Sequence, residues 1–277
     1  MADKKREGRP AAKEPYRKRP DEIRQEAPEE TRENDGTVIA GRNAVIEALK
    51  SGRGIECVYM LTGERTGSLV EIEHRCREAK IPVKEASRKK LDELSFGEHH
   101  QGVVALAQAY AYAEVEDILA KAREKNEPPF IVLLENIQDP HNLGAVIRTA
   151  EACGVHGIII SRHNAVGLTA AVVKTAAGAC EYVPVAKVGN MVQTIEKLQK
   201  EGLWVAAADM DGEEARKADL TGPIALLIGS EHKGVGRLVK EKCDRVVKIP
   251  MRGNINSLNA SVAAGILMYE IMTQRGN

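Results

Sequence analysis

Hydrophobic and polar positions alternate in blocks along the chain, and the period of each block predicts its secondary structure. From about residue 38 to residue 110, the helical patterns "NAVIEALKSG", "GSLVEIEHRCREAK" and "KKLDELS" alternate with the strand patterns "IECVYML", "IPVKEAS" and "GVVALAQAY". Alternating helices and strands of this length are typical of a small α/β domain. We therefore predict a first domain over residues 37–110.

A second series of blocks begins at Phe130 and has more strongly apolar strands. Strands that are apolar on both faces favour a mostly parallel sheet with helices on each side, so the fold class is α/β. In such sheets, ligands bind at the carboxyl ends of the strands. We predict a second domain over residues 130–277. Its strands are "FIVLLENI", "GIIIS", "EYVPV", "LWVAAAD", "IALLIGS" and "RVVKIPM", with helices that begin near Asn142, Leu168, Met191, Gly236 and Leu258.

The remaining segments are strongly charged. Residues 1–36 contain almost no large apolar side chains, so we expect a disordered tail, most simply a solubilising extension whose basic half could also contact phosphates. Residues 111–129 form the predicted linker, in which "AEVEDILAKAREKNEPP" has the pattern of a charged amphipathic helix that ends before Pro128 and Pro129.

Composition narrows the possible classes of protein. The 277 residues suffice for two cores, and an aromatic content of 3% disfavours an RNA module built on stacked aromatic rings. The chain has no C-x-x-C pair and no long apolar run, so we expect a reduced, cytoplasmic protein without a membrane span. The seven histidines lack zinc-site spacing, and we predict no metal. The five cysteines, expected mainly in the core, are Cys57, Cys76, Cys153, Cys180 and Cys243.

Basic residues cluster in the first domain even though the net charge of the chain is zero. Arg88, Lys89 and Lys90 are adjacent, and Arg42 belongs to a wider scatter of cations. Two interpretations stay open, an RNA-binding surface or a merely solvated face.

Three polar loops follow apolar strands in the second domain. The first brings in Asn142 and a helix that carries Arg148 and Glu151 three residues apart. The plainer interpretation is that Asn142 caps the helix and that Arg148 and Glu151 form a surface ion pair. A site built at the strand ends is the alternative.

The other two loops also have two interpretations each. "LLIGSEHKGVG" contains Glu231 and the glycine spacing of a phosphate loop, but Val235 replaces the required lysine, so a Walker-type nucleotide site is disfavoured. In "RGNINSLN", Ser257 and Asn259 can cap the last helix. That helix is apolar on every side, so a homodimer interface would bury it.

Taken together, these loops resemble the SpoU/TrmH family of RNA ribose 2′-O-methyltransferases, in the SPOUT superfamily. The matching segments are "NLGAVIRTAEACG", "LIGSEHKGVG" and "IPMRGNINSLNASVAAGI", and the similarity spans about residues 130–274. The first domain is similar to the family's L30e-like substrate-binding module through "GRNAVIEAL" and "HQGVVA".

The resemblance implies a trefoil knot in the C-terminal domain, S-adenosylmethionine as cofactor and RNA as substrate. By family position it implies an adenosine pocket at Gly229, Ile249 and Leu258. It assigns catalytic or orienting roles to Asn142, Arg148, Glu231, Ser257 and Asn259, with Glu151 beside them. Arg42, Arg88, Lys89 and Lys90 are the expected RNA contacts.

A guanidinium hardly deprotonates near neutral pH, so we hypothesise that Arg148 holds a phosphate beside the target ribose, and that this phosphate or a water takes the proton. The accessory first domain favours 23S ribosomal RNA as substrate. The alternatives are transfer RNA methylation, or a non-catalytic RNA-binding or ribosome-assembly factor.

Overall fold

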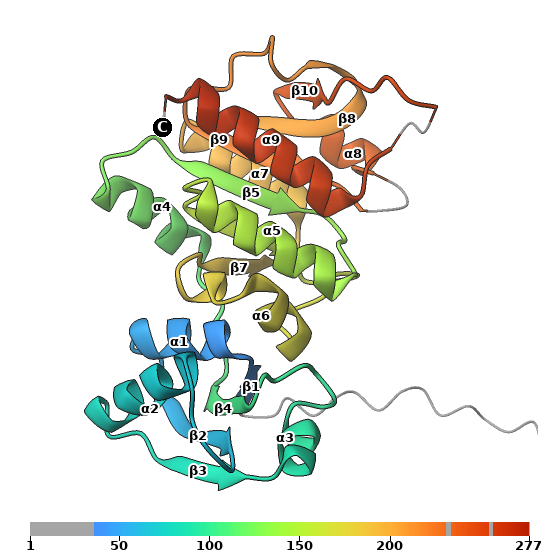
Figure 1. Cartoon of the computed structure of the whole chain (residues 1–277). Coiled ribbons are helices and arrows are strands. Elements are labelled where there is room, and N and C mark those ends of the chain that lie inside the picture. The colour runs from blue at the N-terminus through green and yellow to red at the C-terminus, as the bar shows by residue number, and fades with distance from the viewer. Residues whose placement is uncertain (1–35, 231–233, 255–256, 277) are drawn as a thin grey trace, which may run out of the picture. The chain divides into compact units, whose positions relative to one another are not determined.

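Two β-sheets, each formed by one stretch of sequence, organise the part of the chain that the structure describes (Figure 1). This computed structural model describes residues 36–230, 234–254 and 257–276. The predicted tail therefore lies outside the described residues, apart from Gly36. Residues 35–277 belong to one compact unit.

The first domain contains a four-stranded sheet in the order β1-β4-β2-β3. β4 is antiparallel to β1 and β2, whereas β2 and β3 are parallel. The predicted helices and strands are confirmed, and β1 is an additional strand that the sequence pattern did not reveal. The elements are β1 Gly36–Ala40, α1 Arg42–Lys50, β2 Ile55–Leu61, α2 Ser68–Glu78, β3 Val83–Ala86, α3 Arg88–Leu94 and β4 Val103–Gln108.

The second domain contains a six-stranded sheet in the order β10-β8-β9-β5-β6-β7, and every neighbouring pair is parallel. The predicted mostly parallel sheet is thus confirmed. Its elements are β5 Phe130–Leu134, α5 Pro140–Ala152, β6 Gly157–Ser161, α6 Ala170–Ala176, the 3₁₀ helix η1 Ala179–Glu181, β7 Val185–Val188, α7 Met191–Lys200, β8 Trp204–Glu214, β9 Ile224–Ile228, α8 Arg237–Lys240, β10 Arg245–Lys248 and α9 Ala260–Gln274.

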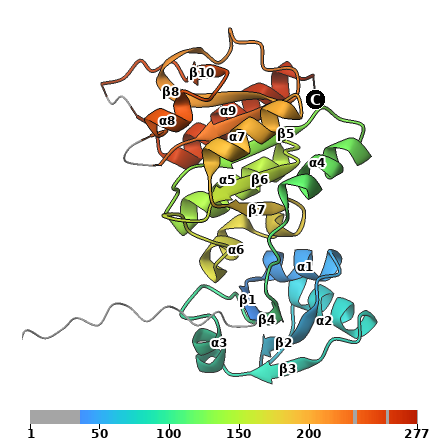
Figure 2. The same ribbon diagram turned by 180° about the vertical axis from the view of Figure 1, so that it is seen from behind.

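Helices cover both faces of this second sheet, as the central strand β5 shows. Phe130, Val132 and Leu134 pack in the cluster that contains α5, α6 and α9. Ile131 and Leu133 point the other way, into the cluster that contains α4, α7 and α8. Figures 1 and 2 show these two layers from opposite sides. Burial of both faces explains why the strands are continuously apolar instead of alternating.

The predicted amphipathic helix in the linker is confirmed as α4, Val115–Glu124, which starts with a capping box between Glu114 and Asp117. Its apolar side is buried in the core of the second domain. The contact is close, because a Cβ placed on Gly157 of β6 would lie 2.6 Å from the side chain of Ile118.

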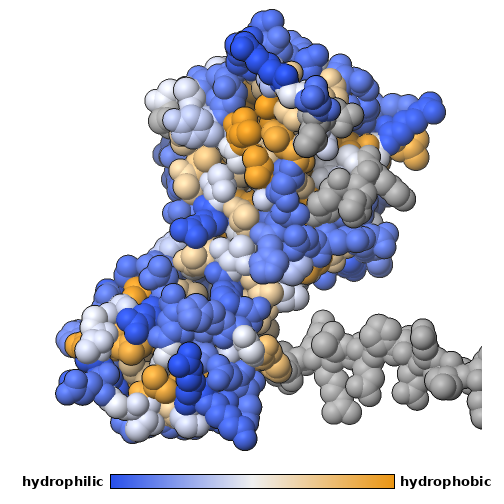
Figure 3. All heavy atoms as spheres, turned by 45° about the vertical axis from the view of Figure 1, so that its right-hand side comes forward, coloured by the Kyte–Doolittle hydropathy of each residue, from blue (hydrophilic) through white to orange (hydrophobic). Residues whose placement is uncertain are grey.

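The last helix, α9, is buried on one side only. Leu267, Met268 and Ile271 lie in the core, whereas Val262 and Ile266 are 49% and 43% exposed. Figure 3 shows an area of apolar side chains on the second domain. No helix in the described ranges combines the length and apolar character needed to cross a membrane.

Candidate active site

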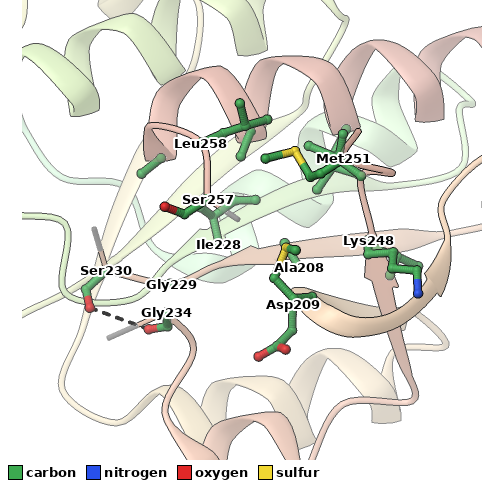
Figure 4. A pocket seen from close by; sticks show the side chains of 16 residues that line it. Ala208, Asp209, Ile228, Gly229, Ser230, Gly234, Lys248, Met251, Ser257 and Leu258 are labelled. Atoms are coloured by element: carbon green, nitrogen blue, oxygen red, sulfur yellow. Dashed lines mark hydrogen bonds between the residues drawn. The ribbon is translucent and has the colours of Figure 1, made fainter. Parts of the chain in front are cut away.

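Three neighbouring strands of the second sheet surround a cavity of about 400 Å³ (Figure 4). Parallel strands place their carboxyl ends at one edge, so the segments that follow β9 and β10 meet there, beside the part of β8 beyond its last pairing with β9. The size is that of a small-molecule site. The cavity is lined by Ala208, Asp209, Met210, Ile228, Gly229, Ser230, Gly234, Val247, Lys248, Ile249, Met251, Ser257, Leu258, Ala260, Ala263 and Leu267.

The structure brings together the three residues that the sequence assigns to the adenosine pocket. Gly229, Ile249 and Leu258 all line this one cavity, and Ser257 joins them. In Figure 4, Leu258 and Met251 lie along one side of the cavity, opposite the carboxylate of Asp209. Apolar walls with a few polar groups are typical of a site for a small organic ligand.

Gly229 is required by the way the second loop folds back on itself. Ser230 and Gly234 exchange backbone hydrogen bonds of 3.0 and 2.9 Å across the turn. A Cβ on Gly229 would lie only 2.0 Å from the carbonyl carbon of Gly234, so no side chain fits without backbone movement. Glu231, predicted in this loop, lies outside the described residues.

Glu135 fixes the far end of the same loop. This side chain follows β5 and is only 8% exposed, and its Oε2 accepts a hydrogen bond of 2.8 Å from the N–H of Gly236. The start of the first polar loop is thereby tied to the end of the second. A buried carboxylate with a backbone donor is a stable arrangement, because the hydrogen bond offsets part of its desolvation.

Asp209 supplies a carboxylate to the cavity. Its Oδ2 lies 2.9 Å from Lys240 Nζ, and its Oδ1 accepts a 3.1 Å hydrogen bond from the N–H of Asp211. Burial raises the pKa of Asp209, but these two hydrogen bonds outweigh it and hold the pKa below its ordinary value. The group is therefore an oriented anion at neutral pH.

Asn142 is not the cap of its helix, so that plainer interpretation is wrong. α5 begins at Pro140, and the cap is Asp139, whose side chain accepts from the N–H of His141. Asn142 is 5% exposed, and its Oδ1 accepts a 2.9 Å hydrogen bond from Nδ2 of Asn259. Because Asp139 caps the helix, α5 starts before Asn142, and Asn142 lies in its first turn with a buried side chain.

Asn259 is confirmed as the cap of α9. Its Oδ1 accepts from the N–H groups of Ser261 and Val262, while its amide nitrogen binds Asn142. Since Leu258 and Ala260 on either side of it line the cavity, the Asn142–Asn259 pair connects α5 to the cavity wall.

Arg148 lies elsewhere in the single chain. It does not line the strand-end cavity but a second hollow, together with Glu151, Tyr182 and four residues of α1, among them Asn43 and Glu47. The surface ion pair between Arg148 and Glu151 is absent, and Arg148 makes no ion pair with any described residue. The exposed guanidinium is thus free to bind an anion.

Two of the four predicted RNA-contact residues already have hydrogen-bond or ion-pair partners within the protein. Arg42 donates to the carbonyl of Gln101, and Lys90 lies 3.5 Å from Glu93. Arg88 and Lys89 are exposed and have no ion-pair partner among the described residues. The unengaged charge therefore lies at the start of α3.

Sequence reasoning missed Glu135 and Asp209, although each had a signal. Both are the first carboxylate after an apolar strand run, "FIVLLE" and "LWVAAAD". The strand-end rule that selected the loops applies to them as well.

Over the described ranges, no group of three or more His, Cys, Asp or Glu side chains is arranged to hold a metal ion.

A parallel α/β sheet with a cavity at its carboxyl edge, joined to a second α/β module, is typical of proteins that bind a small ligand at the strand ends. Family models identify it further. Residues 129–269 match the SpoU rRNA Methylase family, and residues 38–113 match the RNA 2′-O ribose methyltransferase substrate binding family. The chain belongs to the SpoU family and is an S-adenosylmethionine-dependent RNA 2′-O-ribose methyltransferase.

This chain matches relatives of known sequence over nearly the whole length of those relatives. A Bacillus subtilis (strain 168) protein, named provisionally as the TrmH family tRNA/rRNA methyltransferase YacO, is 48% identical over 238 residues, 86% of this chain and 95% of that one. A Staphylococcus haemolyticus protein with a similar name is 43% identical over 86% of this chain and 96% of its own.

Solved structures show the same fold at lower identity. The AdoMet complex of the SpoU methyltransferase AviRb from Streptomyces viridochromogenes matches with a TM-score of 0.73 at 24% identity, over 87% of this chain and 91% of that one. An AdoMet-bound rRNA methyltransferase from Sinorhizobium meliloti matches with a TM-score of 0.71 at 24% identity, over 86% and 87%.

Proposed function

We propose that this protein methylates a ribose 2′-hydroxyl of 23S ribosomal RNA in the cytoplasm. The observation that carries the proposal is the strand-end cavity, because Gly229, Ile249 and Leu258 meet on its wall in the same chain as a substrate-binding module for RNA. In this family such an accessory module is typical of members that act on large-subunit ribosomal RNA, which favours that substrate over transfer RNA.

The residues of the cavity fit the cofactor. Leu258 and Ile249 would enclose the adenine ring, and the backbone at Gly229 would approach the adenosine closely. Asp209 is an anion held in place by Lys240. It would therefore accept a hydrogen bond from the cofactor or lie near the positive charge of the cofactor's amino-acid end. When bound, S-adenosylmethionine supplies a methyl group that is already activated by its sulfonium.

The protein must then align a weak nucleophile and help its proton leave. We assign to Arg148 the binding of the phosphate beside the target ribose, supported by its exposed guanidinium without an ion pair. That phosphate or a water accepts the proton of the 2′-hydroxyl. Asn142 and Asn259 orient the wall of the cavity, and Ser257 lies on that wall.

We further propose a homodimer that forms through α9. Three of its side chains, Val262, Ile266 and Tyr269, are 43% to 62% exposed, and the neighbouring Leu258 is 39% exposed. Apolar groups gathered on one helix face are stabilised by burial against a second copy. The dimer would cover the side of the chain next to the cavity, since Leu258 belongs to both.

The C-terminal chain is also proposed to be threaded as a trefoil knot. The segments after β9 and β10 meet at one cavity, and α9 packs on α5. Those contacts support the threading that the family resemblance implies, although knots are rare among folds.

Transfer of radiolabelled methyl groups into protein-free ribosomal RNA and, separately, into transfer RNA tests the choice of substrate. We expect label in ribosomal RNA and only background in transfer RNA. Label confined to transfer RNA would replace the proposed substrate by the alternative one.

A non-catalytic RNA-binding or assembly factor is the competing proposal from another functional class. It predicts binding of ribosomal RNA without label in either RNA, even when binding of S-adenosylmethionine is measured in the same sample. The closed glycine loop and the cavity of about 400 Å³ argue against it, since a factor that does not use the cofactor has no need of either.

A further inference from the structure

Phe96, directly after α3, has an exposed ring that the packing of the protein does not explain. Its side chain is 72% exposed, more than that of any other aromatic residue in the described ranges, the next being Tyr269 at 62%. The ring makes no cation–π contact with a described residue, whereas Trp204, also exposed, has Arg245 5.5 Å from its ring centroid. An isolated apolar ring in water gains from any flat partner.

The backbone at Phe96 is strained for such a side chain. Its φ of 53° lies in the left-handed region, where glycine or asparagine usually ends a helix. The N–H of Phe96 donates to the carbonyl of Glu93, and the N–H of Gly97 donates to that of Asp92, which is the hydrogen-bond pattern of a glycine-terminated helix. A bulky residue kept in this conformation points to a functional reason.

The turn that carries Phe96 is firmly held. Ser95, 1% exposed, donates through Oγ to the carbonyl of Glu98 at 3.0 Å. His100, 7% exposed, accepts from the N–H of Gly102 through Nδ1, and its Nε2 lies 3.1 Å from Asp92 Oδ1. The turn therefore presents the ring from a fixed position, which lowers the entropy lost when a ligand binds.

Unengaged positive charge lies at the other end of the same helix. Arg88 and Lys89 have no ion-pair partner among the described residues, as noted above. Lys89 lies in the first turn of α3 and Phe96 just past its last turn, so the cations and the ring are about 10 Å apart along the helix axis. Cations beside an exposed ring fit a phosphate backbone with an unstacked base.

We propose that Phe96 stacks on one unpaired base of the RNA substrate, while Arg88 and Lys89 bind the neighbouring phosphates. This inference rests on the proposed RNA substrate and names a subsite for it on the first domain. The low aromatic content still disfavours a platform for several bases, but one ring is enough for one base. Arg42 and Lys90, already engaged within the protein, contribute less.

The variant Phe96→Asn separates stacking from structure. Asparagine tolerates the left-handed backbone, so we expect the melting temperature to rise or stay unchanged. Loss of the ring should nevertheless weaken binding of protein-free ribosomal RNA by about 5- to 100-fold. Loss of a purely structural residue would not weaken RNA binding while the melting temperature stays the same or rises.

Two controls define the effect. Val70→Ala removes an apolar side chain of α2 that is 50% exposed, and it should leave RNA binding unchanged. Blunt duplex RNA offers no unpaired base, so its binding should not respond to Phe96→Asn. Affinity for S-adenosylmethionine should equal that of the wild type in every variant.

Salt dependence and fluorescence distinguish the two kinds of contact. Arg88→Ala and Lys89→Ala should each lower the slope of log affinity against log salt by about 1, whereas Phe96→Asn should leave the slope unchanged. In a Trp204→Phe background, Phe96→Trp should bind with near wild-type affinity, and its fluorescence should fall when RNA is added.

The inference is overturned if the wild type methylates ribosomal RNA and Phe96→Asn binds that RNA equally well. It is also overturned if Phe96→Trp shows no fluorescence change at saturating RNA. If the wild-type protein neither binds nor methylates RNA, the proposed function itself is contradicted.

Discussion

At the residue scale, Gly229 gives the sharpest prediction about the cavity. A Cβ there would lie 2.0 to 2.3 Å from the backbone of Gly234 and Val235, so Gly229→Ala must open the closed loop. We expect affinity for S-adenosylmethionine, measured by titration calorimetry, to fall by about tenfold or more, from the few kcal/mol of strain that must be relieved.

Gly222→Ala is the matched control, because Gly222 precedes the strand that Gly229 follows and has no atom within 4 Å of an added Cβ. Its affinity for the cofactor should equal that of the wild type. Equal affinities for both variants would show that the closed loop is not part of the cofactor site.

Arg148 gives a second prediction at this scale, which concerns its role as phosphate ligand. With saturating RNA, Arg148→Ala should lower the single-turnover methylation rate by about 100-fold or more, because a mispositioned ribose loses alignment with the methyl group. Arg148→Lys keeps a positive charge and should retain a measurable rate. A lysine variant as inactive as the alanine variant would favour two-pronged guanidinium geometry or a true base role instead.

Some site residues could be predicted from the sequence because a family motif fixes their place, whereas others depend on how the chain folds. Ile249 and Leu258 were found because the family motif fixes their place in the chain, and the structure puts both on one cavity. The inward side chain of Asn142 could not be read from spacing, since it depends on where the helix starts. Phe96 could not be found either, because exposure is a property of the folded chain.

At the element scale, the connection before β5 should make stability depend on pH. His156, 1% exposed, accepts from the N–H of Phe130 through Nδ1, and its Nε2 lies 3.1 Å from Glu127. Burial lowers the pKa of His156 from 6.5, against the opposing effect of Glu127. The folded state therefore prefers the neutral ring.

The sign of the effect follows from this lowered pKa. The unfolded chain binds a proton at higher pH than the folded one, so the contribution of His156 is complete above about pH 6.5 and is lost as the pH falls. Its loss is at most about 1.4 kcal/mol per pH unit. Urea unfolding between pH 7.5 and 5 should show this decline.

His156→Asn should be less stable at pH 7.5 yet show a flatter pH dependence. The same change at the exposed His74 should leave the profile of the wild type intact. A profile for His156→Asn as steep as that of the wild type would assign the pH dependence to other groups.

Most helices and strands were predictable because their period is a local property of the sequence. The sequence predicted a mostly parallel sheet but not the order of its six strands, since pairing depends on packing between distant segments. β1 was missed because its five residues directly follow the polar tail, without a helix before them. β8 extends to Glu214, beyond the apolar run, because its later residues pair with β10 after a register shift.

At the scale of the whole molecule, the proposed dimer can be tested on α9. A charge at the half-exposed Ile266 is tolerated in a monomer but not in an apolar interface. We expect the wild type to sediment as a dimer and Ile266→Glu as a folded monomer. Val70→Glu, with a similar exposure on α2, should remain dimeric. A monomeric wild type at micromolar concentration would contradict this proposal.

Within a single chain, Arg148 and the strand-end cavity lie apart. The sequence placed them in one site by family position, and within a single chain they line different hollows. Which surfaces meet in an assembly depends on a second copy, and no pattern along one sequence contains that information.

The most direct test of the central claim is nucleoside analysis after reaction with S-adenosylmethionine that carries a deuterated methyl group. Protein-free ribosomal RNA is incubated with the wild type and with Gly229→Ala, digested, and examined by mass spectrometry. We predict one 2′-O-methyl nucleoside that carries the deuterated methyl with the wild type and a strongly reduced amount with the variant. Deuterated methyl on a base, or none with the wild type while the cofactor binds, would contradict the account.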